Sequence, residues 1–121
     1  MPHCILETSD NLIEIINKKE LLLQINKCIE ETGLFNINDI KSRYVVHTNY
    51  VIGDGDVNRA FVTLNVAILS GRNQETKNMI SNKCLEILRP IFRESMKKLK
   101  FSLTVQITEI DKESYAKEKS Y

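Results

Sequence analysis

Two long segments of the chain carry apolar residues at intervals of three and four positions. The first covers residues 12 to about 31, and the second covers about 74 to 98. This spacing gathers the apolar side chains on one side of a helix, so each segment predicts an amphipathic helix with one face against the core. Asn11 and Glu14 have the spacing of a capping box at the start of the first helix. Pro90 predicts a kink in the second.

Four shorter segments have the β-branched, aromatic or alternating composition of strands. They cover residues 3–7, 43–51, 59–69 and 101–107. Each predicted helix stands between two of them, so the order strand, helix, strand occurs twice. An overlay that places His3 on Phe61 also places Tyr44 on Ser102, so the two halves have matching element lengths. This pattern is typical of a structural repeat.

The two strand-helix-strand units, about residues 2–51 and 59–110, imply right-handed crossovers between parallel strands. One apolar face per helix implies that both helices cover the same side of a common sheet. We therefore predict a single α+β domain over residues 1–121, with a four-stranded mixed sheet and two helices on one face. The other face of the sheet has no helix over it, which predicts that it packs against another subunit in an oligomer. Residues 111–121 carry charges of alternating sign and are predicted to be a solvated or frayed tail without chemistry.

The composition is that of an ordinary globular protein, with 42% hydrophobic and 27% charged residues, which argues against a disordered chain. The longest apolar runs are too short to span a membrane, and the first residues lack the basic and apolar regions of a signal peptide. The expected location is therefore the cytoplasm. Cys4, Cys28 and Cys84 are widely spaced and odd in number, so we expect reduced, buried thiols.

Net charge argues against nucleic acid as a partner, and the spacing of the possible ligands argues against a metal. Lys and Arg number 17 against 16 Asp and Glu, a net charge of +1 that provides no attraction to nucleic acid. On a strand that rises ~3.3 Å per residue, His3 and Glu7 would lie about 13 Å apart, too far to share a metal. Asp54 and Asp56 lack the rest of a calcium loop and predict a turn. Neither nucleic acid nor a metal is expected.

Pro2 is the residue with the clearest potential for chemistry. Removal of Met1 would leave a secondary amine at the N-terminus, and an α-amino group titrates near pH ~8 before any perturbation. Burial or neighbouring cations bring such an amine closer to neutrality, where it works well as a general base. In many proteins, however, a proline after the initiator methionine does no more than permit methionine removal, so Pro2 alone does not establish catalysis.

Several short motifs, taken in order and spacing, give a more specific indication. They are Pro2-His3, Glu7-x-Ser9-x-Asn11-Leu12, Thr32-Gly33-Leu34-Phe35, Ser42-Arg43, Ala60-Phe61-Val62 and Gly71-Arg72. Over roughly residues 2–110 they resemble the 5-carboxymethyl-2-hydroxymuconate isomerase family of the tautomerase superfamily. The resemblance implies a homotrimer in which three sheets pack together, with active sites near the subunit interfaces and with no cofactor and no metal.

The family reaction implied by this resemblance is a 1,3-allylic proton transfer in homoprotocatechuate degradation. In it, a dienol bearing several carboxylates becomes an unsaturated oxo acid, and Pro2 would move the proton as general base and acid. Arg72 matches the family arginine that follows a glycine at the start of the second helix. It would bind a substrate carboxylate or the negative charge that develops on the dienolate oxygen. The implied ligand is a small polycarboxylate.

A second family arginine is replaced in this chain. The aligned position holds Lys41, and Arg43 matches another family arginine two residues further on. Lysine keeps the charge but lacks the bidentate geometry of arginine, which leaves the exact substrate open. If the strand includes Lys41, both cations share one strand face and could line one pocket edge; alternatively, they lie solvated at the strand end. His3 is expected to pack or hydrogen-bond so that it orients the N-terminus.

Two other functions stay open from the sequence. A tautomerase that acts on another enol acid, such as a phenylpyruvate-like compound, would prefer a monocarboxylate. A non-catalytic trimeric binding module would keep the fold and would be indifferent to the loss of Pro2.

Overall fold

A computed structural model describes the chain from Met1 to Tyr121. Its strands are β1 (His3–Ser9), β2 (Lys41–His47), β3 (Arg59–Leu69) and β4 (Lys100–Ile110). Its helices are α1 (Lys18–Glu30), α2 (Gln74–Leu88) and α3 (Arg93–Lys98), and a short 3₁₀ helix, η1 (Ile37–Asp39), precedes β2. None of the helices has both the length and the apolar character needed to cross a membrane.

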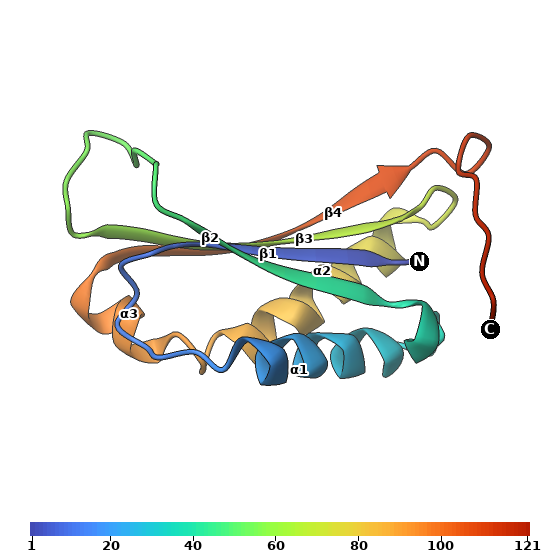
Figure 1. The fold of residues 1–121 in the computed structure, drawn as a ribbon, viewed down its shortest axis with the longest axis horizontal. Helices are drawn as coiled ribbons and strands as arrows, with labels where there is room; N and C mark the ends of the chain where they lie inside the picture. The colour runs from blue at the N-terminus through green and yellow to red at the C-terminus, as the bar shows by residue number, and fades with distance from the viewer.

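The strands form one mixed sheet in the order β2-β1-β3-β4. β1 runs parallel to β2 and β3 runs parallel to β4, while β1 and β3 are antiparallel. Figure 1 shows α1, α2 and α3 on the same side of the sheet. The predicted α+β fold of two βαβ units is therefore confirmed, with three helices rather than two on the covered face.

The core lies between the sheet and the helices. Successive side chains of a strand point to opposite faces, so every second residue of β3 is buried under α1 and α2. The largest fully buried apolar side chains are Leu6, Ile25, Ile29, Val62, Leu64, Val66, Ile68, Ile80, Leu88 and Phe92. Cys4, Cys28 and Cys84 are free and buried, as predicted.

The first helix begins at Lys18, later than the predicted residue 12. The Asn17 side chain caps it by accepting from a first-turn N–H at 3.2 Å. The expected capping box does not form, because both of its side chains bind elsewhere. The Asn11 amide donates to backbone carbonyls just before and at the start of β3. The Glu14 carboxylate accepts from the N–H and the hydroxyl of Ser95 in α3.

The second predicted helix is interrupted rather than kinked. Pro90 has no backbone N–H, so the hydrogen-bond ladder of α2 cannot continue through it. The N–H of Ile91 bonds instead to the carbonyl of Leu88 at 3.1 Å, which tightens the turn. The buried Phe92 then precedes α3.

Strand lengths follow the length of each strand's partner. β2 covers Lys41–His47 rather than residues 43–51, because its last residue pairs with Ser9 at the end of β1 and no partner exists beyond it. β4 is longer than predicted, because it pairs with β3 along its whole length, from Lys100 opposite Arg59 to Ile110 opposite Leu69.

The sheet face opposite the helices is polar at its centre. The Thr104 hydroxyl donates to the Thr63 hydroxyl at 2.9 Å, and the Gln106 amide donates to Asn65 at 3.1 Å. These bonds join β3 to β4 side by side and satisfy the side chains in pairs. The prediction that this face is covered by another subunit stays a prediction.

Residues 111–121 are mostly exposed, as a solvated tail would be, but several of them contact the rest of the chain. After β4 the chain turns back toward η1 and the N-terminus (Figure 1). The Tyr115 hydroxyl lies 3.2 Å from His3 Nε2, and the Tyr121 hydroxyl donates to the backbone carbonyl of Asn38 at 2.9 Å. Lys119 pairs with the Asp39 carboxylate at 3.0 Å. A single sequence does not show which distant acid or ring such residues face.

Candidate active site

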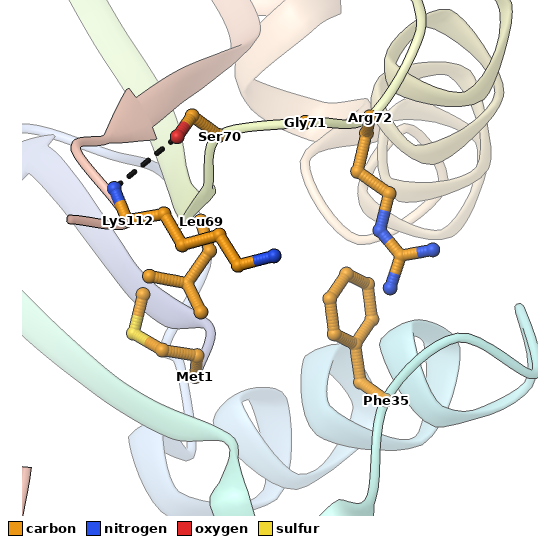
Figure 2. Close-up of a pocket in the computed structure, with 7 residues that line it drawn as sticks. All are labelled: Met1, Phe35, Leu69, Ser70, Gly71, Arg72 and Lys112. Carbon is orange, nitrogen blue, oxygen red and sulfur yellow. Dashed lines mark hydrogen bonds between the residues drawn. The ribbon is translucent and has the colours of Figure 1, made fainter.

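The N-terminus borders a pocket of about 320 Å³ at the sheet end where β1 begins and β3 and β4 end. Its lining residues are Met1, Phe35, Leu69, Ser70, Gly71, Arg72 and Lys112. Figure 2 shows Met1 and Leu69 together on one side, while the long side chain of Lys112 extends toward Phe35 and Arg72. The pocket therefore combines apolar walls with two cationic side chains.

Arg72 is positioned by the turn between β3 and α2. Gly71 has φ +118°, a conformation that side-chain-bearing residues rarely adopt, so this turn favours glycine. The Arg72 guanidinium donates to the backbone carbonyl of Leu34 at 3.3 Å and lies 5.2 Å from the centre of the Phe35 ring. Such stacking holds the cation in place without neutralising it. The structure thus places Arg72 in the pocket beside the N-terminus.

Pro2 is fully buried, and only 8% of Met1 is exposed. The Met1 amine donates to the backbone carbonyl of Asp39 at 2.9 Å. Burial lowers the pKa of this amine, and Lys117 and Lys41 lower it further by charge repulsion, although Asp39 acts in the opposite direction. The Pro2 nitrogen itself belongs to the Met1–Pro2 amide and lies three covalent bonds away, within about 4 Å.

Lysines gather on the side of Met1 that faces η1. The Lys41 ammonium donates to the Asp39 carbonyl at 3.4 Å, which is the same oxygen that binds the Met1 amine. Lys117 and Lys119 lie 3.6 and 3.0 Å from one Asp39 carboxylate oxygen. The Asp39 carboxylate therefore faces two lysines, and the backbone carbonyl of the same residue binds a third. Lys41 lines a second hollow with residues 115–121, not the Arg72 pocket.

Arg43 and His3 lie on the helix-free face of the sheet, outside the Arg72 pocket. Both terminal nitrogens of the Arg43 guanidinium lie 3.4 Å from His3 Nδ1, and the Tyr115 hydroxyl lies 3.2 Å from His3 Nε2. Burial lowers the pKa of the His3 ring, and Arg43 lowers it further, so the ring is neutral near pH 7. His3 joins the start of β1 to β2 and to the C-terminal segment.

Sequence reasoning missed Lys112, Tyr115, Lys117 and Lys119, all of which lie near the N-terminus. Their alternation with acids is typical of a solvated surface, and nothing local distinguishes them. The signal that could have found Lys112 is the strand register. Once β4 is extended to pair with all of β3, the residues after Ile110 fall beside Ser70 and the Gly71 turn.

Nowhere in the chain do three or more His, Cys, Asp or Glu side chains meet so that they could hold a metal ion. Burial raises the pKa of the Cys4 thiol to about 11, so this cysteine is not a ready nucleophile. The chemistry available at the pocket is that of the N-terminal residues and the surrounding cations.

Two βαβ units around one mixed sheet, with the N-terminus in a cationic pocket, define the tautomerase-superfamily fold. A solved structure described as a fused 4-OT wild-type symmetric trimer shares it, with a TM-score of 0.70, 16% sequence identity, and coverage of 91% of this chain and 86% of the other. That comparison supports the fold alone.

Closer comparisons define the family. The model of the 5-carboxymethyl-2-hydroxymuconate isomerase family matches residues 2–121, so the chain belongs to that family of isomerases. The curated Escherichia coli 5-carboxymethyl-2-hydroxymuconate Delta-isomerase is 28% identical over 110 residues, which are 91% of this chain and 87% of that protein. The crystal structure of a 5-carboxymethyl-2-hydroxymuconate isomerase from Deinococcus radiodurans R1 is 26% identical, with a TM-score of 0.90 and coverage of 98% and 90% of the two chains.

Proposed function

We propose that this isomerase ketonises 5-carboxymethyl-2-hydroxymuconate or a similar carboxylated dienol, with Pro2 as the general base and acid. The observation that carries the proposal is the position of the N-terminus. It lies beside a pocket that contains Arg72 and in the field of Lys41, in a chain that the family model matches from residue 2 onward. No redox step or cofactor is required, because the reaction only moves a proton.

Removal of Met1 turns the Pro2 nitrogen from an amide into a secondary amine. Since the Met1 side chain lines the pocket, its loss exposes this amine to a bound substrate. The same lysines that lower the pKa of the Met1 amine lie near the Pro2 nitrogen and keep part of it unprotonated near neutral pH. Pro2 then takes the proton from the enol hydroxyl and returns it to a substrate carbon, which leaves the ketone.

The cations supply binding and charge stabilisation. Arg72 binds a substrate carboxylate, or the dienolate oxygen on which negative charge develops, with its position fixed by Phe35 and the Leu34 carbonyl. Of Lys41 and Arg43, Lys41 is the better candidate for an additional anchor, because it shares the Asp39 carbonyl with the N-terminal amine. Arg43 points to His3 instead.

The proposed assembly is a homotrimer. One related structure is described as a symmetric trimer, and the polar sheet face of this chain is open to a neighbouring subunit. The loop between β2 and β3 also exposes apolar residues, since Val51 and Val57 are 80% and 85% exposed. Their exposure supports burial of this loop against a neighbouring subunit. The three free, buried thiols fit the reducing cytoplasm as the site of action.

The test compares two forms of the same protein, one without Met1 and one that retains it, each verified by intact mass. Ketonisation of 5-carboxymethyl-2-hydroxymuconate is followed by ultraviolet absorbance. The form without Met1 is expected to turn over, and retention of Met1 or the substitution Pro2→Ala is expected to lower kcat by about 100-fold or more. Equal turnover by both forms would exclude Pro2 as the base.

Two further outcomes separate the alternative functions. Turnover of a phenylpyruvate-type enol in preference to 5-carboxymethyl-2-hydroxymuconate would indicate a tautomerase for monocarboxylates. No turnover of any enol acid by the form without Met1 would indicate a non-catalytic binding protein.

A further inference from the structure

We propose that Lys112 is a substrate-binding residue whose ammonium binds a second carboxylate of the substrate, opposite the anion held by Arg72. The inference rests on the proposed function of the same pocket and adds a specificity residue to it. Lys112 comes from the segment after β4 and lines the pocket with Met1, Leu69 and Arg72.

The backbone fixes Lys112 relative to Arg72. The Lys112 N–H donates to the Ser70 hydroxyl at 3.2 Å, which is the dashed line in Figure 2. The Ser70 N–H in turn donates to the Ile110 carbonyl at 2.9 Å. Ser70 and Arg72 flank Gly71, so both cations are attached to one hydrogen-bonded turn. A binding residue in such a position loses little backbone freedom when a ligand arrives.

Neither cation of the pocket has an acidic partner. All ion pairs of the chain shorter than 4.0 Å involve other residues. Asp111 is the acid nearest to Lys112 in sequence, but its carboxylate accepts from the Ser114 hydroxyl and the Glu113 N–H. Lys77, by contrast, pairs with Glu109 at 2.7 Å. The pocket therefore holds two positive charges that a dianion would neutralise.

The lining also limits the shape of the ligand. Leu69 supplies an apolar wall and Phe35 offers a ring face, and both remain when Met1 is removed. Apolar walls reduce local solvent screening, which strengthens attraction between an ammonium and a carboxylate. The matching ligand is a small acid with carboxylates at two separated positions and an apolar, conjugated middle. A monocarboxylate would leave one cation without a partner.

The kinetic test uses Lys112→Gln, which removes the charge, and Lys112→Arg, which keeps it. The matched control is Lys97→Gln, because Lys97 is an exposed lysine of α3 without an acidic partner. We expect Lys112→Gln to raise KM for the carboxylated dienol about 10- to 100-fold with kcat changed less than threefold. KM for a monocarboxylate enol should stay unchanged, and Lys112→Arg should restore most of the affinity for the carboxylated dienol. Equal effects on both substrates, or none, would overturn the inference.

A binding measurement separates this inference from the proposed reaction. Glutarate, a dicarboxylate, and butyrate, a monocarboxylate, are titrated into the protein without Met1 and followed by NMR. We expect glutarate to bind more tightly than butyrate, and this preference to disappear in Lys112→Gln but not in Lys97→Gln. If the unaltered protein does not turn over any enol, the proposed function fails while this preference still tests Lys112. If glutarate binds no better than butyrate, the role of Lys112 is wrong even where turnover is found.

Discussion

Lys41 and Arg43 follow one another on the same face of β2, yet their charges are used differently. Lys41 shares a carbonyl oxygen with the N-terminal amine, whereas Arg43 lies against the neutral ring of His3. Position within a strand thus places two cations on one side, but the contacts of the two side chains differ.

These contacts predict unequal effects of neutralising the two residues. Lys41→Gln removes a cation beside the proposed base and should lower kcat/KM about tenfold or more, because a hydrogen bond or ion pair to a substrate anion is lost. Arg43→Gln should change kcat/KM less than threefold. Steady-state kinetics on the carboxylated dienol checks the order. A larger loss in Arg43→Gln would show that the arginine, and not Lys41, replaces the missing family residue.

At the scale of elements, the segment before α1 is held by one serine in α3. Ser95 is fully buried; its hydroxyl donates to Glu14 at 2.5 Å and accepts from the Ile13 N–H at 3.0 Å. Burial alone would raise the pKa of the Glu14 carboxyl, but the Ser95 hydrogen bonds outweigh it and the pKa is lowered. Glu14 therefore stabilises the fold in its ionised form.

Ser95→Ala should lower the free energy of unfolding by about 1–3 kcal/mol, because it leaves the Ile13 N–H and one carboxylate oxygen without partners. A carboxyl with a lowered folded pKa stabilises above its unfolded pKa, about 4.3, and loses this effect as pH falls through the folded value. The loss in the free energy of unfolding caused by Ser95→Ala should therefore be smaller at acidic pH. Urea unfolding at pH 7 and pH 3 measures it. Ser81→Ala is the control, since that hydroxyl bonds only within its own helix.

The C-terminal segment acts on the opposite end of the molecule, around the N-terminal amine. Lys117 and Lys119 both lower the pKa of that amine, in addition to the larger effect of burial. The proposed base, the Pro2 amine of the form without Met1, lies within about 4 Å of the Met1 amine, and the same lysines should lower its pKa. A base with a lowered pKa is unprotonated at lower pH, so the acid limb of the rate profile should move down in pH. Removal of the two lysines should reverse this shift.

We expect Lys117→Gln/Lys119→Gln to move the acid limb of kcat/KM to higher pH, with little change in the plateau. Deletion of residues 115–121 should produce the same shift and also remove the Tyr115 contact with His3. Rates between pH 5 and 9 provide the measurement, with Lys83→Gln/Lys97→Gln as the charge-matched control, since both are exposed lysines of the helices. An unchanged acid limb in both variants would mean that the tail does not tune the base.

Elements that depend only on local periodicity were predicted well from the sequence. Element boundaries that depend on contacts with distant residues were predicted less well. The repeat of βαβ units and the position of Arg72 after Gly71 follow from local pattern. The start of α1 does not, because Glu14 binds Ser95 rather than the backbone of Asn11. The end of β2 depends on where β1 ends. Lys112 looks like any solvated lysine until the register of β4 against β3 places it beside Ser70.

For the whole molecule, the proposed trimer would cover the helix-free sheet face. Thr63 and Thr104 hydrogen-bond to one another at its centre, so the face is polar without exposing unsatisfied side chains there. Such a neutral polar face can pack closely against the same face of another subunit. A charge introduced there would be costly, because it would be buried at the interface without a partner. The proposed trimer thus makes a sharp prediction at this position.

The unaltered protein should have a solution mass three times that of its 14.0 kDa chain, measured by light scattering after size exclusion. Thr63→Arg should reduce that mass and lower turnover, because it places a cation from every subunit at the proposed interface. Asn82→Arg adds the same side chain on the exposed surface of α2 and should alter neither mass nor activity. Circular dichroism separates loss of assembly from unfolding. A folded Thr63→Arg variant that keeps the full mass would show that subunits do not meet through this face, and a monomeric unaltered protein with full turnover would show that the site is complete in one chain.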